Sequence, residues 1–185
     1  DRRALNSAAL CGQSGPGAAH LWHMPGHTFS SLKRYDAAAW QQEAAARVDH
    51  AWMEANSLMP DQIHNYAHNN DWLVENLFFL GRVEEALKLA KNMIELPQLA
   101  PQTVVIGKAK FDAQRSSYVM GARRLVQVML ENELWNKLLQ LRGTPYLQER
   151  VDVVDEAQRL NALVWACSQL GNREEAALEN GRLKA

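Results

Sequence analysis

The sequence lacks the features that mark several common classes of protein. It has only two cysteines, Cys11 and Cys167, and neither belongs to a CxxC pair, so no zinc-knuckle or thioredoxin-type motif is present. The net charge of −1 gives no basic surface for nucleic acid. No apolar run approaches the roughly 18 residues of a membrane span. Phosphate loops, dinucleotide fingerprints, GxSxG elbows and HExxH are also missing, so none of the corresponding enzyme classes has motif support.

The residues that are abundant favour helix. Alanine, leucine, glutamate, glutamine, arginine and lysine dominate, whereas threonine and isoleucine are scarce. No short segment alternates apolar and polar residues between turn signals, as a half-buried strand would. A hydrophobic fraction of 47% over 185 residues is enough for one sizeable core. The sequence therefore predicts an all-α fold.

Large and small residues recur in a pattern along the chain. Trp22, Gly26 and Phe29 precede a first turn, and a small or apolar residue follows each turn in the next helix. Four such turns are expected, at Lys33-Arg34, Gly81-Arg82, Glu131-Asn132-Glu133 and Gly171-Asn172. The pattern resembles the tetratricopeptide repeat, in which W-x2-L-G-x2-Y is followed by spaced small residues, with Pro25 at the usual leucine position.

The segments His23-Met24-Pro25-Gly26-His27 and His68-Asn69 resemble, in particular, a group of bacterial repeat proteins with an HMPxH motif and a later His-Asn pair. The resemblance covers residues 18–185 and implies a tetratricopeptide-like α-solenoid of about four antiparallel helix pairs. We expect residues 1–17 to be a flexible N-terminal segment and residues 18–185 to be a single domain of a longer chain. The predicted helices are 18–33, 36–58, 61–80, 83–96, 108–131, 134–142, 150–170 and 173–184.

All six histidines lie within the first 68 residues. Three of them, His20, His23 and His27, recur at i, i+3 and i+7, so they share one face of a helix. His64 and His68 form an i, i+4 pair on the next predicted first helix, and the same stripe continues through Asp71 and Glu75. A titratable stripe of this kind is unusual for a purely structural helix.

The repeat resemblance implies that both stripes face one concave groove, because the first helix of each pair lines that surface. Neighbouring first helices pack about 8–10 Å apart, so side chains from two repeats can converge. We treat Trp72 as a groove residue and the other tryptophans as core. The candidate groove residues are His20, His23, His27, Asn65, His68, Asn69, Asp71, Trp72 and Glu75.

Two functions remain open for this groove. As an interaction scaffold, it would hold a protein or peptide segment, or another domain of the same longer chain, without a cofactor. As a metal site, in a metal-binding protein or a metal-dependent enzyme, His23, His27 and His68, with Asp71 or Glu75, would bind zinc or another divalent transition metal. Catalysis by a histidine acting as acid or base has no motif to support it. Neither nucleic acid nor a membrane is an expected partner.

Overall fold

The structure is a computed structural model that describes residues 2–99 and 112–184, apart from the side chains of Arg2, Arg3 and His64. Every regular element in these residues is helical, which confirms the all-α prediction. The α-helices are α1 (Arg2–Ser14), α2 (Ala19–Ser31), α3 (Tyr35–Asn56), α4 (His64–Phe79), α5 (Val83–Glu95), α6 (Ser117–Glu131), α7 (Trp135–Gln140), α8 (Val153–Gln169) and α9 (Arg173–Lys184). Short 3₁₀ turns lie at Pro60–Gln62, Ala113–Arg115 and Pro145–Leu147. Within the described chain, no helix is both long and apolar enough to cross a membrane.

All but one of the helix boundaries lie within three residues of those predicted, and two of the differences have a clear local cause. The helix predicted over 61–80 begins at His64, because Pro60 starts a 3₁₀ turn and Ile63 is extended. The helix predicted over 108–131 begins at Ser117, after a 3₁₀ turn at whose start the Asp112 side chain accepts a hydrogen bond from the N–H of Gln114. Residues 108–111 of that prediction lie outside the described residues.

The N-terminal segment expected to be flexible is helical from Arg2 to Ser14. It is held because Ala8 joins Phe29 and Ala38 in a buried apolar cluster, with Leu5 packed against it. Near the end of the helix, Gly12 lies directly against Trp22, which leaves no space for a side chain there. The apolar contacts of α1 explain why this glycine- and serine-containing stretch is ordered.

The same turn joins the helices of four pairs: α2–α3, α4–α5, α6–α7 and α8–α9. In each turn one residue has a left-handed backbone, and the N–H of the residue after it donates to the carbonyl five positions earlier. The left-handed residues are Lys33, Gly81, Glu133 and Gly171. On both sides of each turn a residue is buried, and these residues form the pairs Phe29 and Ala38, Leu77 and Ala86, Met129 and Leu138, and Cys167 and Ala176. The four turns therefore share one backbone geometry, and each has buried residues at the same two positions relative to the turn.

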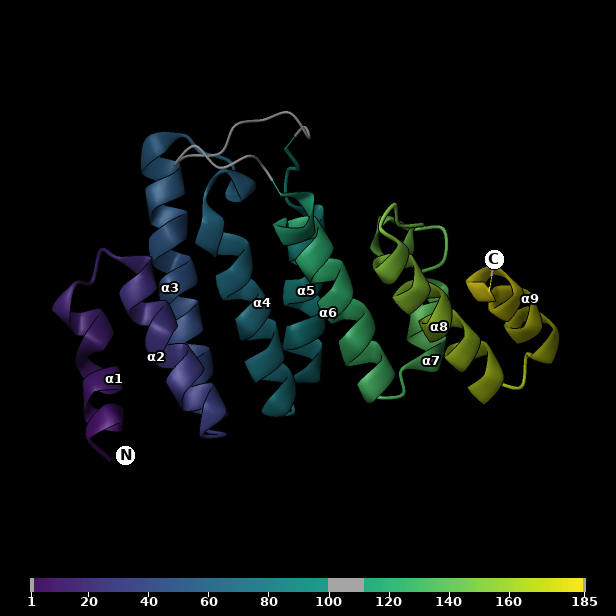
Figure 1. Ribbon diagram of the computed structural model, residues 1–185, viewed down its shortest axis with the longest axis horizontal. Coiled ribbons are helices and arrows are strands. Elements are labelled where there is room, and N and C mark those ends of the chain that lie inside the picture. Colours follow the sequence, from purple (N-terminus) through teal and green to yellow (C-terminus); the bar gives the residue numbers. More distant parts are fainter. Residues whose placement is uncertain (1, 100–111, 185) are drawn as a thin grey trace. The chain divides into compact units, whose positions relative to one another are not determined.

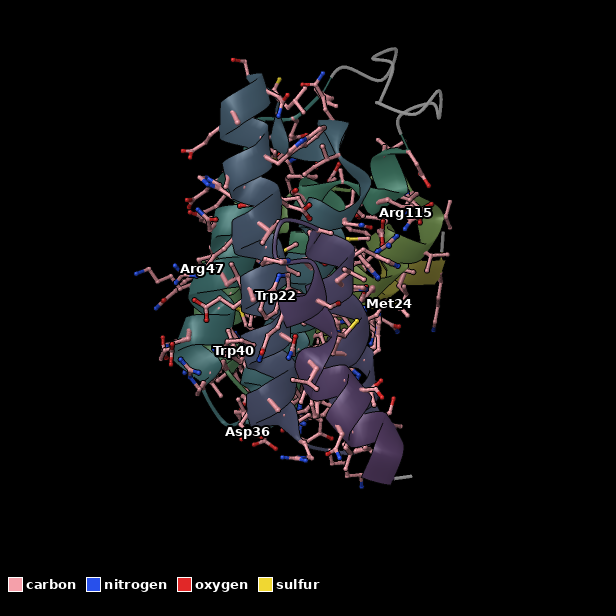
Figure 2. The ribbon with its side chains drawn as sticks, turned by 90° about the vertical axis from the view of Figure 1, so that its left-hand side faces the viewer. Trp22, Met24, Asp36, Trp40, Arg47 and Arg115 are labelled. Carbon is pink, nitrogen blue, oxygen red and sulfur yellow. The ribbon has the colours of Figure 1, made fainter. Side chains whose placement is uncertain are left out.

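The chain divides into two compact units, Asp1–Gly121 and Ala122–Ala185, where the sequence predicted one domain over 18–185. In the first unit, helices α1 to α5 each pack against the next along the chain, and α2 also contacts α4 (Figure 1). Trp22 of α2 and Trp40 of α3 meet edge to face, with ring centroids 5.4 Å apart (Figure 2). The contact between α2 and α4 is the one that creates the candidate site.

In the second unit, α8 packs against α7 and α9. Its interior is apolar around Leu163 and Cys167, and the buried charges Asp155 and Arg159 are in ion pairs. Arg142 bonds to Glu175 at 2.8 Å, and its guanidinium lies 3.1 Å from the sulfur of Cys167. Arg142 thus has a charged and a polar neighbour, as a partly buried charge requires.

Candidate metal centre

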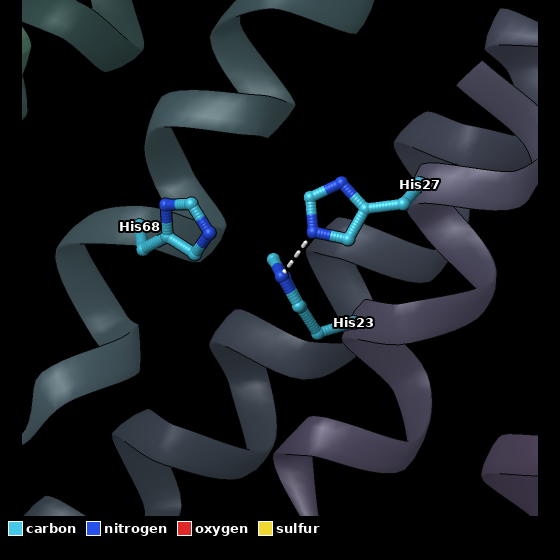
Figure 3. A group of neighbouring side chains, drawn as sticks. All are labelled: His23, His27 and His68. Atoms are coloured by element: carbon cyan, nitrogen blue, oxygen red, sulfur yellow. Dashed lines mark hydrogen bonds between the residues drawn. The ribbon is translucent and has the colours of Figure 1, made fainter. Parts of the chain in front are cut away.

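Three histidines from two helices meet at the contact between α2 and α4. His23 and His27 are one helical turn apart on α2, and His68 projects from α4 (Figure 3). One ring nitrogen of each residue can be chosen so that all three nitrogens lie within 4.8 Å of one another. We call these three residues the histidine cluster. The sequence predicted that they would converge, and the structure brings them together.

His23 is the buried member of the cluster, with only 2% of its surface exposed. Its Nδ1 lies 2.8 Å from Oε1 of Gln42 on α3, and Nε2 of Gln42 donates to the backbone carbonyl of His23 at 3.3 Å. Because the amide nitrogen is used in the second bond, Oε1 is the acceptor and Nδ1 of His23 carries the proton. The lone pair of His23 therefore lies on Nε2, which faces the other two histidines.

Gly26 makes this arrangement possible. A Cβ at position 26 would lie 2.3 Å from Nε2 of Gln42, well inside contact distance. Gln42 itself is completely buried, so its amide has no open space into which to move. The absence of a side chain at Gly26 thus admits the Gln42 amide that orients His23.

Two members of the histidine cluster, His23 and His27, have lowered pKa values, which favours the uncharged form that a metal requires. Burial, followed by the charge of His27, lowers the pKa of His23 to about 4, although the hydrogen bond to Gln42 acts in the opposite direction. Burial and His20 also lower the pKa of His27. Nε2 of His27 lies 2.6 Å from Nε2 of His23, and with the His23 proton on Nδ1, His27 is the donor in this bond. To bind a metal through Nε2, the neutral ring of His27 would carry its single proton on Nδ1 instead, so its net charge would not change.

Aromatic neighbours surround the cluster. The Trp72 ring meets His27 edge to face at 4.3 Å between centroids, and His68 at 6.4 Å. On the other side His20, which is exposed, stacks on His23 at 5.9 Å. Trp72 and His20 therefore border the cluster, as expected from their places on the two helix faces.

The predicted carboxylates lie outside the ligand group. Asp71 and Glu75 are half-buried on α4, and neither belongs to the group of nitrogens within 4.8 Å. Glu75 is near enough to raise the pKa of His27, against the larger effects of burial and His20. Asn65 is half-buried on the first turn of α4, and the side chain of His64 lies outside the described set.

Asn69 has a different role from the one expected. It is completely buried, so it does not line a groove, and its Nδ2 donates to Oδ2 of Asp49 on α3 at 2.7 Å. The reason is geometric, because Asn69 follows His68 directly and successive helical side chains point about 100° apart. Burial raises the pKa of Asp49 to about 6, and the bond from Asn69 opposes that rise.

Sequence reasoning missed Gln42 and Asp49. A signal for Gln42 existed: it lies four residues after Ala38 and three before Ala45, on the buried stripe of α3. A polar residue within such a stripe needs a buried hydrogen-bond partner, and here that partner is His23. Asp49 had no comparable signal, since its partner Asn69 was assigned to the groove.

The spacing of the cluster fits a tetrahedral metal ion after a small adjustment. Nitrogen ligands 2.0–2.1 Å from zinc in a tetrahedral site are about 3.3 Å from each other. The closest pair here is 2.6 Å apart, and all three nitrogens lie within 4.8 Å, so the required separation falls inside the observed range. His23 and His27 would move slightly apart as their hydrogen bond is replaced by metal coordination.

The chain was compared with family models, curated proteins and solved structures, and it matches none of them.

Proposed function

We propose that this chain is a helical-repeat protein that binds one divalent transition metal ion, zinc being the first candidate, through His23, His27 and His68. The observation that carries the proposal is the convergence of three histidine ring nitrogens from two helices. The Gln42 amide supports it further, because metal-ligating histidines usually donate their second N–H to a protein acceptor.

The three imidazole nitrogens favour divalent transition metals over magnesium or calcium. Imidazole nitrogen suits zinc, copper, nickel and iron, whereas magnesium and calcium prefer oxygen ligands. No thiolate or carboxylate belongs to the described ligand group, so a calcium-type or cysteine-rich site has no support. Zinc is the first candidate because it accepts a three-histidine tetrahedral site without redox chemistry.

We also propose that the fold is a tetratricopeptide-like solenoid. The shared turn geometry and the buried pair at each turn support this, since stacked helix pairs of one design are typical of such repeats. In this arrangement the repeats serve to hold α2 and α4 at the separation that the metal needs.

The second candidate is a groove that binds a protein or peptide segment. Exposed His20 and half-buried Trp72 favour it, because both lie at the edge of the histidine cluster and could contact a bound chain. Histidines would then act as hydrogen-bonding groups, and the affinity for a peptide would not depend on metal.

A competition titration with a zinc chelator tests the first proposal. We expect one zinc per chain, and an affinity reduced by a factor of about 100 or more in His23→Ala, His27→Ala and His68→Ala, because a lost ligand costs more than a lost outer contact. His50→Ala is the matched control, since His50 is exposed on α3 and pairs with Glu54 outside the cluster. Circular dichroism would verify that each variant remains helical.

Equal zinc binding by the wild type and the three cluster variants would contradict the metal proposal. Peptide binding that persists in a chelator and is lost in Trp72→Ala would then favour the groove.

A further inference from the structure

The three members of the histidine cluster differ in their exposure. His23 is buried and has Gln42 of α3 behind it, whereas His27 and His68 are only half-buried. A metal bound by all three nitrogens is therefore closed on the side of α3. Its remaining coordination position is directed toward the partly exposed side, between α2 and α4.

Protein ligands in the described part of the chain fill three positions, not four. The group of side chains that can share a metal contains the histidine cluster alone, and both Asp71 and Glu75 lie outside it. Structural zinc sites usually have four protein ligands, whereas sites with three leave one position for water or an exogenous ligand. With three protein ligands, the cluster resembles the sites that leave one position for water or an exogenous ligand.

The charge balance selects the kind of exogenous ligand. Three neutral imidazoles do not lower the charge of a divalent ion, and Glu75 acts on the site only from outside the ligand group. An anion in the fourth position lowers that charge directly. Trp72 packs against His27 and lies near His68, so its indole borders the half-buried side on which this ligand would bind.

We infer that the bound metal keeps one coordination position open for a small oxygen or nitrogen anion, which binds beside Trp72. This inference rests on the metal binding proposed above, and it makes the site a ligand-binding centre in addition to a structural crosslink between α2 and α4.

Cobalt substitution followed by azide titration tests the inference. Cobalt replaces zinc and gives visible absorption bands that respond to the number and type of its ligands. We expect azide to shift these bands in a saturable, one-site manner. Glu75→Gln and His64→Ala should retain the shift, because neither residue is assigned as a ligand. Trp72→Ala should weaken azide binding by about 3- to 10-fold, the size of a lost aromatic contact, while Trp40→Ala, an exposed tryptophan away from the cluster, should not.

The possible failures are distinguishable. If cobalt binds, is lost in His23→Ala, and gives bands that azide does not move, the inference is wrong and the metal proposal stands. Bands that change in Glu75→Gln or His64→Ala without azide would identify a fourth protein ligand and also overturn the inference. Failure of cobalt and zinc to bind at the cluster would remove the proposed function itself.

Discussion

Helix pairs α2–α3 and α4–α5 share a turn but enclose different interiors. Counted from the left-handed residue of each turn, Gly26 in the first pair corresponds to Val74 in the second, and Gln42 corresponds to Ala90. Val74 and Ala90 are fully buried apolar residues. The first pair thus has a glycine and an amide where the second has an ordinary apolar contact.

The difference shows how a helix pair can hold a buried amide and imidazole in place of an apolar contact. The backbone register stays the same, because Phe29 and Ala38 still form the buried pair beside the turn. Removing the side chain at position 26 makes room for Gln42, and Gln42 in turn satisfies the buried His23. A buried polar group is tolerated only when it is hydrogen-bonded, so the three residues depend on one another in the folded protein. The following variants test the comparison.

The largest effect is expected from Gly26→Ala. Its Cβ would displace the buried Gln42 amide, so we expect the free energy of unfolding to fall by about 2–3 kcal/mol, as in other overpacked interiors. Gly181→Ala is the matched control, since Gly181 also lies in a helix and has open space around its Cβ position. That variant should be neutral or stabilised by up to about 1 kcal/mol. Urea unfolding measures both; equal effects would contradict the packing role of Gly26.

Gln42→Ala should weaken zinc binding by about 10- to 100-fold, because His23 would lose the acceptor that fixes its proton on Nδ1. The neighbouring Gln41 is the matched control. It is also buried on α3, but its Oε1 has no hydrogen-bond partner among the described residues. Chelator competition should therefore give Gln41→Ala the affinity of the wild type. A similar loss in both variants would indicate a general effect of disturbing α3.

Asp49→Asn should change how stability depends on pH. The pKa of Asp49 is raised from 3.8 to about 6, so between these values the folded state binds more protons than the unfolded state. The wild type therefore loses stability as pH rises through this window, by up to about 3 kcal/mol, and the asparagine variant does not. We expect the variant to be the more stable protein at pH 7.5, and the advantage to disappear near pH 4. Thermal unfolding at both pH values checks this, and an advantage independent of pH would contradict it.

The smallest effects concern the shared turn. Lys33 and Glu133 adopt left-handed backbones that favour glycine, as Gly81 and Gly171 do in the other two turns. Lys33→Gly and Glu133→Gly should each raise the free energy of unfolding by about 0.5–1 kcal/mol, and Gly81→Ala and Gly171→Ala should lower it by about 1 kcal/mol. Urea midpoints for the four variants would show whether the turns are energetically alike.

Much of the fold follows from the sequence by local rules. The composition and the lack of strand alternation predicted the all-α class, and the turns of the repeat pattern predicted most helix boundaries. The i, i+4 spacing of His23 and His27 predicted one shared face, and the repeat resemblance placed His68 opposite it. Order in α1 was not predicted, because it depends on contacts of Leu5 and Ala8 with residues far along the chain.

The contacts that Gln42 and Asn69 make with other helices were not predicted, for a related reason. Gln42 reaches His23 from another helix, 19 positions along the chain, and no spacing rule connects two residues of this kind. Asn69 was predicted to lie in the groove as part of the His-Asn pair, whereas its side chain donates to Asp49. Side chains that interact between helices are fixed by packing, which the sequence alone does not specify.

The most direct test of the account is a long-range ¹H–¹⁵N spectrum of the histidine side chains, recorded with and without one equivalent of zinc. Without zinc at pH 7, His23 should be neutral with its proton on Nδ1. Zinc should then shift a ring nitrogen of His23, His27 and His68 and leave His20 and His50 unchanged. A His23 ring protonated on Nε2, or a zinc response confined to His20 and His50, would contradict the central claim that Gly26 and Gln42 prepare a three-histidine metal site.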